Sequence, residues 1–383
     1  MENYYDLAER MKQHYDALQD EKSREIFWAR LRYDVEPTMS NAVCLCQFSD
    51  SYTANEKAYL SSWKDIFSKL GAEGKKVILY GAGRYGQRTA VQIFRESCDF
   101  WGYCDGRTNG RTTLSVSGRE KPMVGPDYLF EHMEDSYVVI TTTDSYLEIL
   151  ALLYQHDFPE DHILPLFFDK CSKCGATFYE KQYFEFPELY PQGTAFVDVG
   201  CFDGSNSIQF VKWCRGMYSK ILAFEPDDKN YELCLSKFEE VGIQNVTLFK
   251  MGLSKTAGTQ LFSSGLNSGS FMVESSKKAE PLNRSYEQAE IFDRIHTVTL
   301  DEIAKDTCVG FIKMDIEGAE FGALQGSSNV IQRDKPLLAI SVYHCRGDIL
   351  AIMDYLHELV PEYRFWVRHY GPLENETVLY AAV

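Results

Sequence analysis

Two segments of the sequence share one pattern, which is a short apolar strand followed by a glycine-containing turn and a helix. The first is KKVILYGAGRYGQRTAVQIF, which begins at Lys75, and the second is TAFVDVGCFDGSNSIQFVKW, which begins at Thr194. Further strand and helix patterns follow each of these units along the chain. Alternation of this kind is typical of a parallel, doubly wound sheet. The sequence therefore predicts an α/β protein with two Rossmann-like domains.

The length of 383 residues exceeds what one ordinary hydrophobic core accommodates, so two domains are expected. Apolar residues at helical spacing predict a helical extension over residues 1–72. The first Rossmann-like domain is predicted over residues 73–168, a linker over 169–192, and the second domain over 193–383, with two antiparallel strands closing its sheet. The extension is expected to pack as a cap on the next domain. A homodimer through these helices is the alternative.

Composition excludes several classes of partner. The formal net charge of −17 argues against a nucleic-acid partner, which needs a basic surface. No apolar run reaches the length of about 18 residues needed for a membrane span, and the charged N-terminal sequence lacks the apolar core of a signal peptide. The eleven cysteines are expected to be reduced thiols of a cytoplasmic protein. Cys171 and Cys174 have metal-like spacing, but a structural zinc site needs four ligands, so a plain loop pair is expected.

The first domain carries the glycine spacing of a dinucleotide fingerprint at Gly81, Gly83 and Gly86. In such a fingerprint the glycines permit a tight turn, close approach of backbone to a pyrophosphate, and packing of helix on strand. Asp105 ends the next strand, where a ribose-binding acid would lie. No tyrosine is followed by a lysine four residues later, so the proton-transfer pair of short-chain dehydrogenases is missing. The domain is predicted to bind a nucleotide or nucleotide sugar, or to be a scaffold that binds nothing.

The second domain places acids beside its glycines at the ends of its strands. Gly200 and Gly204 let backbone approach a ligand, and Asp198 is able to orient an ammonium group directly or through water. Glu225, at the end of the adjacent strand, is able to accept two hydrogen bonds from a ribose diol. A ligand with both an amino-acid end and a ribose is S-adenosylmethionine. The predicted cofactor-binding residues are Asp198, Gly200, Asp203, Gly204, Asn206, Glu225 and Asp315.

The motifs FVDVGCFDGSNS, AFEPD, TLDEI and FIKMDIEGAE together resemble those of FkbM-type methyltransferases, over about residues 193–383. The resemblance implies a class I S-adenosylmethionine-dependent fold and, commonly, O-methylation of sugars or polyketide-like natural products. The predicted function is therefore O-methylation of a saccharide, a nucleotide sugar or a glycosylated natural product, as in polysaccharide biosynthesis. It also places Asp198, Gly200, Asp203 and Glu225 in the cofactor site. In the first domain, GYCDGR followed by KPMVGPDYL resembles nucleotide-sugar-associated Rossmann modules.

Candidates for catalysis follow two later strands. Methyl transfer from a sulfonium to a hydroxyl is an in-line displacement, which gains from alignment and from a base. Asp315, and His344 at the end of LLAISVYH, are joint candidates for the base, and Asp315 alternatively anchors the acceptor hydroxyl. An imidazole with its ordinary pKa is a base near neutral pH, whereas the alternative for His344 is a satisfied buried side chain. Lys313 is expected to pair with Asp315, and Glu320 to begin a helix.

Several alternatives remain open at this stage. Asp315, Glu317 and His344 are donors suited to a divalent metal, but their spacing defines no coordination set, so no metal site is predicted. Residues 262–292 are expected to form a loop or an active-site lid. Arg368 and His369 either contact substrate or face solvent. The rival functions are a non-catalytic scaffold of polysaccharide assembly and a methyltransferase for a peptide or lipid acceptor.

Overall fold

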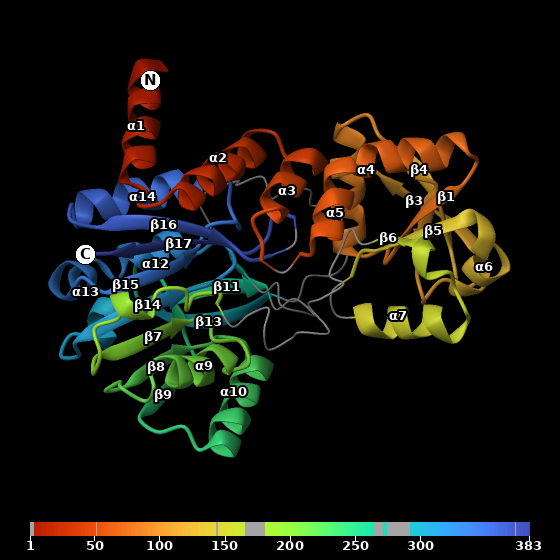
Figure 1. Ribbon diagram of the computed structural model, residues 1–383. Coiled ribbons are helices and arrows are strands. Elements are labelled where there is room, and N and C mark those ends of the chain that lie inside the picture. Colours follow the sequence, from red (N-terminus) through yellow and green to blue (C-terminus); the bar gives the residue numbers. More distant parts are fainter. Residues whose placement is uncertain are drawn as a thin grey trace. The chain divides into compact units, whose positions relative to one another are not determined.

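The computed structural model forms two compact units (Figure 1), each described by itself. Unit 1 consists of Met1–Phe27, Glu180–Arg368 and Glu376–Val383, and unit 2 consists of Trp28–Tyr179 and His369–Asn375. The helices expected as one extension over residues 1–72 are therefore divided between the two units. The structure describes residues 4–50, 52–142, 145–164, 181–263, 271–273, 292–371 and 373–383.

Four helices begin the chain, as the helical spacing predicts: α1 (Tyr4–Ala17), α2 (Glu21–Val35), α3 (Met39–Cys46) and α4 (Ala54–Ala72). Helix α4 starts with a capping box, in which Thr53 Oγ1 accepts the backbone N–H of Glu56 and the Glu56 carboxylate accepts the backbone N–H of Thr53. Helix α1 packs on α14 (Asp348–Leu359) of the same unit, where His14 Nε2 lies 2.7 Å from Asp354 Oδ1. Helix α1 therefore packs within unit 1 and not on the next domain as expected, whereas α4 contacts β1 (Lys76–Tyr80) of unit 2. A homodimer through these helices stays a prediction.

Unit 2 is built on one six-stranded sheet. Its strands are β1 (Lys76–Tyr80), β2 (Gly102–Cys104), β3 (Arg111–Val116), β4 (Arg119–Val124), β5 (Ser136–Ile140) and β6 (Ile163–Leu164). Its further helices are α5 (Arg84–Arg95), α6 (Pro126–Glu131) and α7 (Tyr146–Gln155), with 3-10 turns at Met133–Asp135 and Glu160–His162. The strand order is β3-β4-β2-β1-β5-β6, and β1 runs parallel to both β2 and β5. The predicted Rossmann-like arrangement is confirmed for this unit.

An antiparallel hairpin of β3 and β4 extends the sheet of unit 2, and the sequence analysis missed β3. The two strands are joined by Ser117 and Gly118, which have φ angles of 51° and 74°. Two successive residues with positive φ are the signature of a tight hairpin turn whose twist matches that of the strands. The Ser-Gly pair between two alternating segments was the signal that would have identified the hairpin.

Unit 1 contains a seven-stranded central sheet, covered by helices. Its strands are β7 (Ala195–Val199), β8 (Ile221–Phe224), β9 (Val246–Phe249), β14 (Val309–Met314), β15 (Leu337–Ser341), β16 (Arg364–His369) and β17 (Thr377–Ala382). The helices are α9 (Ser205–Trp213), α10 (Asp228–Val241), α11 (Leu300–Ile303), α12 (Glu320–Gln325), α13 (Ser328–Asp334) and α14, with a 3-10 turn at Pro187–Leu189.

The order of the central strands is β16-β17-β15-β14-β7-β8-β9. Strands β9, β8, β7, β14 and β15 are parallel to their neighbours, whereas β17 pairs antiparallel with β15. This confirms the predicted class I methyltransferase sheet with its C-terminal antiparallel strands. The strand order reverses between β7 and β14, and ligands of such sheets bind outside the carboxyl ends of the strands at that reversal.

Between β9 and β14 the chain forms a small second sheet. Its strands are β10 (Gly252–Leu253), β11 (Gly258–Ser263), β12 (Phe271–Val273) and β13 (Phe292–Val298), in the order β10-β13-β11-β12. The apolar segment VTLFKMGLS (246–254) reads as one strand in the sequence, but it is divided between β9 and β10, which belong to different sheets. Strand β12 falls inside the predicted loop or lid over 262–292. Residues 264–270 and 274–291 of that segment lie outside the described residues, as do Cys171 and Cys174.

The core of unit 1 is aromatic. Phe196 of β7 stacks on Phe210 of α9 with ring centroids 4.1 Å apart, and Phe311 of β14 lies 5.0 Å from Phe196. Every residue of β7, β14 and β15 is buried, as expected for central parallel strands covered on both faces. A polar side chain at these positions therefore needs an internal partner.

The described helices include none that is long and apolar enough to cross a membrane. The cysteines in the described part of the chain, from Cys44 to Cys345, are all free thiols.

The loop His369–Asn375 joins β16 to β17 but belongs to unit 2. Within that unit Arg88 Nε lies 2.6 Å from Glu374 Oε1, and Arg30 donates to the Glu374 backbone carbonyl at 2.8 Å. Ser49 donates to the carbonyl of Tyr370 at 2.8 Å. Three segments from the first quarter of the sequence therefore hold this loop near the C-terminus through polar contacts.

Arg368 is buried, with 8% of its side chain exposed, so the expectation of substrate contact or solvent exposure is wrong for this residue. Its Nη2 lies 2.7 Å from Asp20 Oδ2, and its Nη1 donates to Ser23 Oγ at 2.9 Å. His369 is also buried. Arg368 thus fastens the start of α2 to strand β16.

The Asp20–Arg368 pair predicts a change in acid stability. Burial opposes the charge of Asp20, but hydrogen bonds from Arg368 and Ser23 outweigh it and lower the pKa of Asp20 to about 2. A lowered carboxyl pKa stabilises the folded state above the ordinary value, and this stabilisation is lost as pH falls through the folded value. We expect D20N to lower the melting temperature at pH 7 and to flatten its decline between about pH 4 and pH 2.

Thermal unfolding followed by circular dichroism across this pH range measures both effects. D16N is the matched control, because Asp16 only pairs with Lys12 at the surface, where ion pairs contribute little. If D20N and D16N had the same profile, the proposed role of the buried pair would be wrong.

Candidate functional site

The carboxyl ends of β7 and β14 meet where the strand order of unit 1 reverses. Asp315 donates its backbone N–H to the carbonyl of Val199 at 3.1 Å. Gly200 follows directly, with a φ of 76°, and a Cβ at this position would lie 2.0 Å from the carbonyl oxygen of Asp315. Only glycine permits this approach, so Gly200 brings the predicted cofactor loop against the predicted catalytic segment.

A buried ion pair joins the same two strands. Lys313 and Asp198 are register partners, their side chains are 1% and 0% exposed, and Lys313 Nζ lies 3.1 Å from Asp198 Oδ1. Lys313 also donates to the Gly200 carbonyl at 2.7 Å, and Ser207 donates to Asp198 Oδ2 at 2.7 Å. Burial lowers the pKa of Lys313, but the charges of Asp198 and Asp315 outweigh it and raise that pKa above its ordinary value.

This pairing corrects one expectation. Lys313 was expected to pair with Asp315, but its ion-pair partner in the structure is Asp198. The carboxylate of Asp198 contacts Lys313 and Ser207, and its predicted role toward an ammonium group of the ligand, directly or through water, stays a prediction. The charges of both residues are therefore balanced inside the sheet.

Glu225 follows β8 and is buried, with 5% of its surface exposed. Its Oε2 accepts the backbone N–H of Phe202 at 2.9 Å, and its Oε1 accepts that of Asp227 at 3.0 Å. Burial raises the pKa of Glu225 to about 7 against the opposing effect of these donors. Each carboxylate oxygen has a second acceptor position, so the side chain is able to bind a diol while the backbone holds it in place.

The remaining residues of the predicted cofactor set lie on the turn before α9. Asp203 accepts the backbone N–H of Ser205 at 3.0 Å and pairs with Lys237 of α10. Gly204 has a φ of 76°, and a Cβ there would lie 2.6 Å from the ring of Phe238, so this glycine serves the packing of α10. Asn206 is half-buried in the first turn of α9.

The sequence analysis missed Phe202 on this turn. Its side chain is 46% exposed, although it is a large aromatic residue, and its φ is 51°. Because its backbone N–H binds Glu225, the exposed ring is attached at the predicted cofactor site. An aromatic residue flanked by small and polar ones in CFDG was the available signal.

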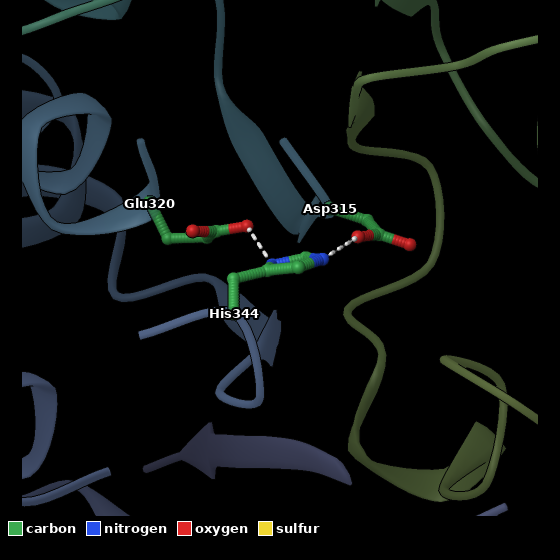
Figure 2. Close-up of side chains that lie close together, drawn as sticks. All are labelled: Asp315, Glu320 and His344. Carbon is green, nitrogen blue, oxygen red and sulfur yellow. Dashed lines mark hydrogen bonds and ion pairs between the residues drawn. The ribbon is translucent and has the colours of Figure 1, made fainter. Parts of the chain in front are cut away.

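A histidine and several carboxylates cluster at the ends of β14 and β15 (Figure 2). His344 Nδ1 lies 2.9 Å from Glu320 Oε1, and its Nε2 lies 3.5 Å from Asp315 Oδ1 and 3.6 Å from Glu317 Oε2. Helix α12 begins at Glu320, as predicted, but this residue also orients His344 and is completely buried. The sequence analysis recognised only its place at the start of the helix.

The pKa of His344 differs from the ordinary value assumed from the sequence. Burial lowers the pKa of His344, but Glu320, Glu317 and Asp315 outweigh it and raise it to about 10. A raised pKa favours the protonated imidazole at neutral pH. It therefore favours Asp315 over His344 as the base, and both assignments stay predictions.

Two tyrosines that the sequence analysis did not consider hold Asp315. Tyr183 donates to Asp315 Oδ2 at 2.6 Å, and Tyr343 donates to Oδ1 at 3.4 Å. Gln182 in turn donates to the oxygen of Tyr183 at 3.0 Å and also to the carboxylate of Glu376. Tyr183 lies in the segment predicted as a linker, which carried no periodic signal.

Three non-glycine residues around Asp315 have left-handed backbone conformations. The φ angles are 68° at Tyr183, 55° at Glu317 and 65° at Glu376. Such conformations cost about 1–3 kcal/mol each and concentrate at functional sites. Their grouping around one carboxylate supports a functional interpretation of this edge of the sheet.

The glycine fingerprint of unit 2 has the predicted local geometry. Gly81 has a φ of 112°, and a Cβ on Gly86 would lie 1.9 Å from the carbonyl oxygen of Gly81. Gly83 immediately precedes α5. Asp105 accepts the backbone N–H groups of Ala82 at 3.2 Å and Arg107 at 3.0 Å. Binding of a nucleotide at this fingerprint stays a prediction.

Comparison with known proteins matches residues 198–370 to the family described as the methyltransferase FkbM domain, which confirms the resemblance carried by the motifs. None of the curated proteins matches the sequence. The crystal structure of methyltransferase FkbM from Methylobacillus flagellatus is 17% identical, with 94% of this chain and 99% of that chain covered and a TM-score of 0.46. An rRNA methylase from Streptococcus thermophilus is 15% identical, with 52% and 91% covered and a TM-score of 0.33. A Streptococcus mutans protein in complex with SAH is 15% identical, with 52% and 95% covered and a TM-score of 0.31.

The close approach at Gly200 leads to a stability prediction. G200A introduces a Cβ 2.0 Å from a backbone oxygen at a positive φ, and we expect it to lower the free energy of unfolding by at least about 3 kcal/mol. G216A is the matched control, because Gly216 has a φ of 72° but nothing within 4 Å of its Cβ position. It should cost only the backbone strain of about 1–2 kcal/mol. Urea unfolding measures the difference, and equal losses would contradict the contact between the two loops.

Proposed function

We propose that the protein transfers the methyl group of S-adenosylmethionine to a hydroxyl of a saccharide, a nucleotide sugar or a glycosylated natural product. The match of residues 198–370 to the methyltransferase FkbM domain supports the methyltransferase part of this proposal. The observation that supports this most directly is the placement of Glu225 and Asp315. They follow strands β8 and β14, on the two sides of β7, at the reversal of strand order. A cofactor site and a reacting centre are expected to adjoin at this position.

Glu225 is the residue proposed to bind the ribose of the cofactor. Its two oxygens are held by backbone donors and have acceptor positions left for a diol. The exposed ring of Phe202 supplies apolar surface beside it. Asp198 and Lys313, which balance each other, support the loop from within the sheet.

Asp315 is the residue proposed to accept the proton of the acceptor hydroxyl. In the transfer, the bond between methyl carbon and sulfur breaks, the bond between methyl carbon and the acceptor oxygen forms, and the hydroxyl proton passes to Asp315. The cofactor supplies the methyl group. Tyr183 fixes the carboxylate through Oδ2 at 2.6 Å, and a fixed orientation of the base is what general base catalysis requires.

The class of acceptor rests on the resemblance of the motifs to FkbM-type enzymes. In unit 2, the glycine fingerprint of Gly81, Gly83 and Gly86 together with Asp105 supports binding of a nucleotide or a nucleotide sugar by that unit. A non-catalytic scaffold and a methyltransferase for peptides or lipids are the competing functions, and the following two experiments separate them.

The cofactor proposal predicts the effect of E225A on binding. Calorimetric titration of the full chain with S-adenosylhomocysteine should show saturable binding, and E225A should weaken it about 10- to 100-fold through loss of charge-assisted hydrogen bonds. E240A is the control, because Glu240 is exposed on α10, and it should bind as the wild type does. No binding by the folded wild-type protein would favour the scaffold, and unchanged binding by E225A would place the ribose elsewhere.

The reaction proposal predicts the effect of D315N on turnover. Transfer of a labelled methyl group should be detected with saccharides or nucleotide sugars, and D315N should lower kcat by about 10²- to 10⁴-fold, as loss of a general base does. The affinity for S-adenosylhomocysteine should stay within a few-fold of wild type. D306N is the control, because Asp306 is an exposed acid. Label found only in peptide or lipid acceptors would overturn the saccharide assignment.

A further inference from the structure

We propose that His344, Asp315 and Glu317 bind one divalent transition-metal ion of the first row, of the type of Zn²⁺ or Mn²⁺, at the carboxyl edge of β14 and β15. The site shares Asp315 with the proposed methyl transfer but does not depend on it, because binding of the ion is measurable without cofactor or acceptor.

The first observation is a buried nitrogen without a hydrogen bond. The side chain of His344 is 7% exposed, and its Nε2 makes no hydrogen bond with the described residues. Its other nitrogen, Nδ1, is engaged by Glu320 at 2.9 Å. A buried polar atom left without a partner is costly, so Nε2 has a position for a ligand. This nitrogen faces the carboxylates of Asp315 and Glu317.

The distances around Nε2 suit a shared ion better than direct hydrogen bonds. Nε2 lies 3.5 Å from Asp315 Oδ1 and 3.6 Å from Glu317 Oε2, which is long for a hydrogen bond between charged groups. Ligand atoms about 2.1 Å from a tetrahedral ion lie roughly 3.4 Å from one another. The imidazole nitrogen therefore lies at ligand-to-ligand spacing from each of the two carboxylates.

Glu320 provides the outer support that metal-bound histidines have. A ligating histidine nearly always donates its second ring N–H to a carboxylate, carbonyl or water, which fixes the ring. Glu320 lies on Nδ1, and its two oxygens also accept the backbone N–H groups of Ile316 at 2.9 Å and Gly318 at 3.0 Å. With both oxygens occupied, Glu320 is a positioning residue, although the donor atoms of Asp315, Glu320 and His344 all lie within 4.8 Å.

The charge balance of the cluster favours a cation. Asp315, Glu317, Glu320 and Glu376 bring four carboxyl groups to this edge of the sheet. The nearby Lys313 has Asp198 as its ion-pair partner at 3.1 Å. A dication held by His344 would balance two of these charges, which reduces the cost of burying them together.

The donor set selects the class of ion. Carboxylates alone suit Mg²⁺ or Ca²⁺, whereas imidazole suits Zn²⁺ and its first-row neighbours. Asp315 would bind through Oδ1, the oxygen that faces His344, and Oδ2 would remain beside Tyr183 for the proton-accepting role proposed above. A bound ion of this kind acidifies a hydroxyl that contacts it, so the site would assist the same reaction.

The test is a metal titration of the full-length protein after treatment with EDTA and removal of the chelator. At pH 7, calorimetry with Zn²⁺ and electron paramagnetic resonance of Mn²⁺ should each show one site per chain. H344Q and E317Q should each weaken binding at least tenfold, and E320Q should weaken it about 10- to 100-fold. E240Q, an exposed acid on α10, is the matched control and should bind as the wild type does.

Each variant is first checked for the melting temperature and for S-adenosylhomocysteine binding, so that loss of folding or of the cofactor site is recognised separately. E317Q keeps the test valid if H344Q does not fold, because the Glu317 side chain is 32% exposed. Absence of a site for both ions in the wild-type protein would overturn the proposal and leave His344 as a protonated partner of its carboxylates. Binding that both H344Q and E317Q retain unchanged would also overturn it.

Discussion

The pairing of Lys313 with Asp198 inside the central sheet is the interaction on which the rest of the site depends. Both side chains are completely buried, and the two residues are opposite each other on β14 and β7. Removal of one partner from such a pair leaves an uncompensated buried charge, at a cost of about 3–5 kcal/mol. The pair therefore constrains the register of the strands whose ends carry the chemistry. Lys313 extends this constraint to the next turn by binding the carbonyl of Gly200.

The two sides of this ion pair, toward β8 and toward β15, differ in their chemical environment. On the β8 side, the Glu225 carboxylate accepts backbone N–H groups, and burial is the main cause of its raised pKa. On the β15 side, charges control one another, because His344 is surrounded by three carboxylates. One edge of the sheet thus carries a carboxyl group held by backbone donors and, separately, a cluster of carboxylates around a histidine. Gly200 keeps the two sites in contact without a side chain between them.

Patterns along the sequence predicted the two Rossmann-like sheets, most of their strands and the residues at the strand ends, because burial and glycine turns are local properties. They predicted the partners of those residues less well. Alternation along β14 shows that Lys313 and Asp315 share a face, but only the strand order shows that Asp198 lies beside Lys313. Likewise, Tyr183 reaches Asp315 from a segment without periodicity. The pKa of His344 depends on three carboxylates and cannot be read from the histidine itself.

The division of the chain has a consequence for biosynthesis. Unit 2 is encoded mainly by early residues, yet Arg88 of α5 finds its partner Glu374 only in the late loop His369–Asn375. Unit 1 also needs residues from both ends of the chain, since the early residue Asp20 pairs with the late residue Arg368. On the ribosome, where chains lengthen at about 5–20 residues per second and completed domains fold first, neither unit is complete until the C-terminal strands emerge. A nascent chain would therefore carry unpaired charges and uncovered apolar surface for most of its synthesis.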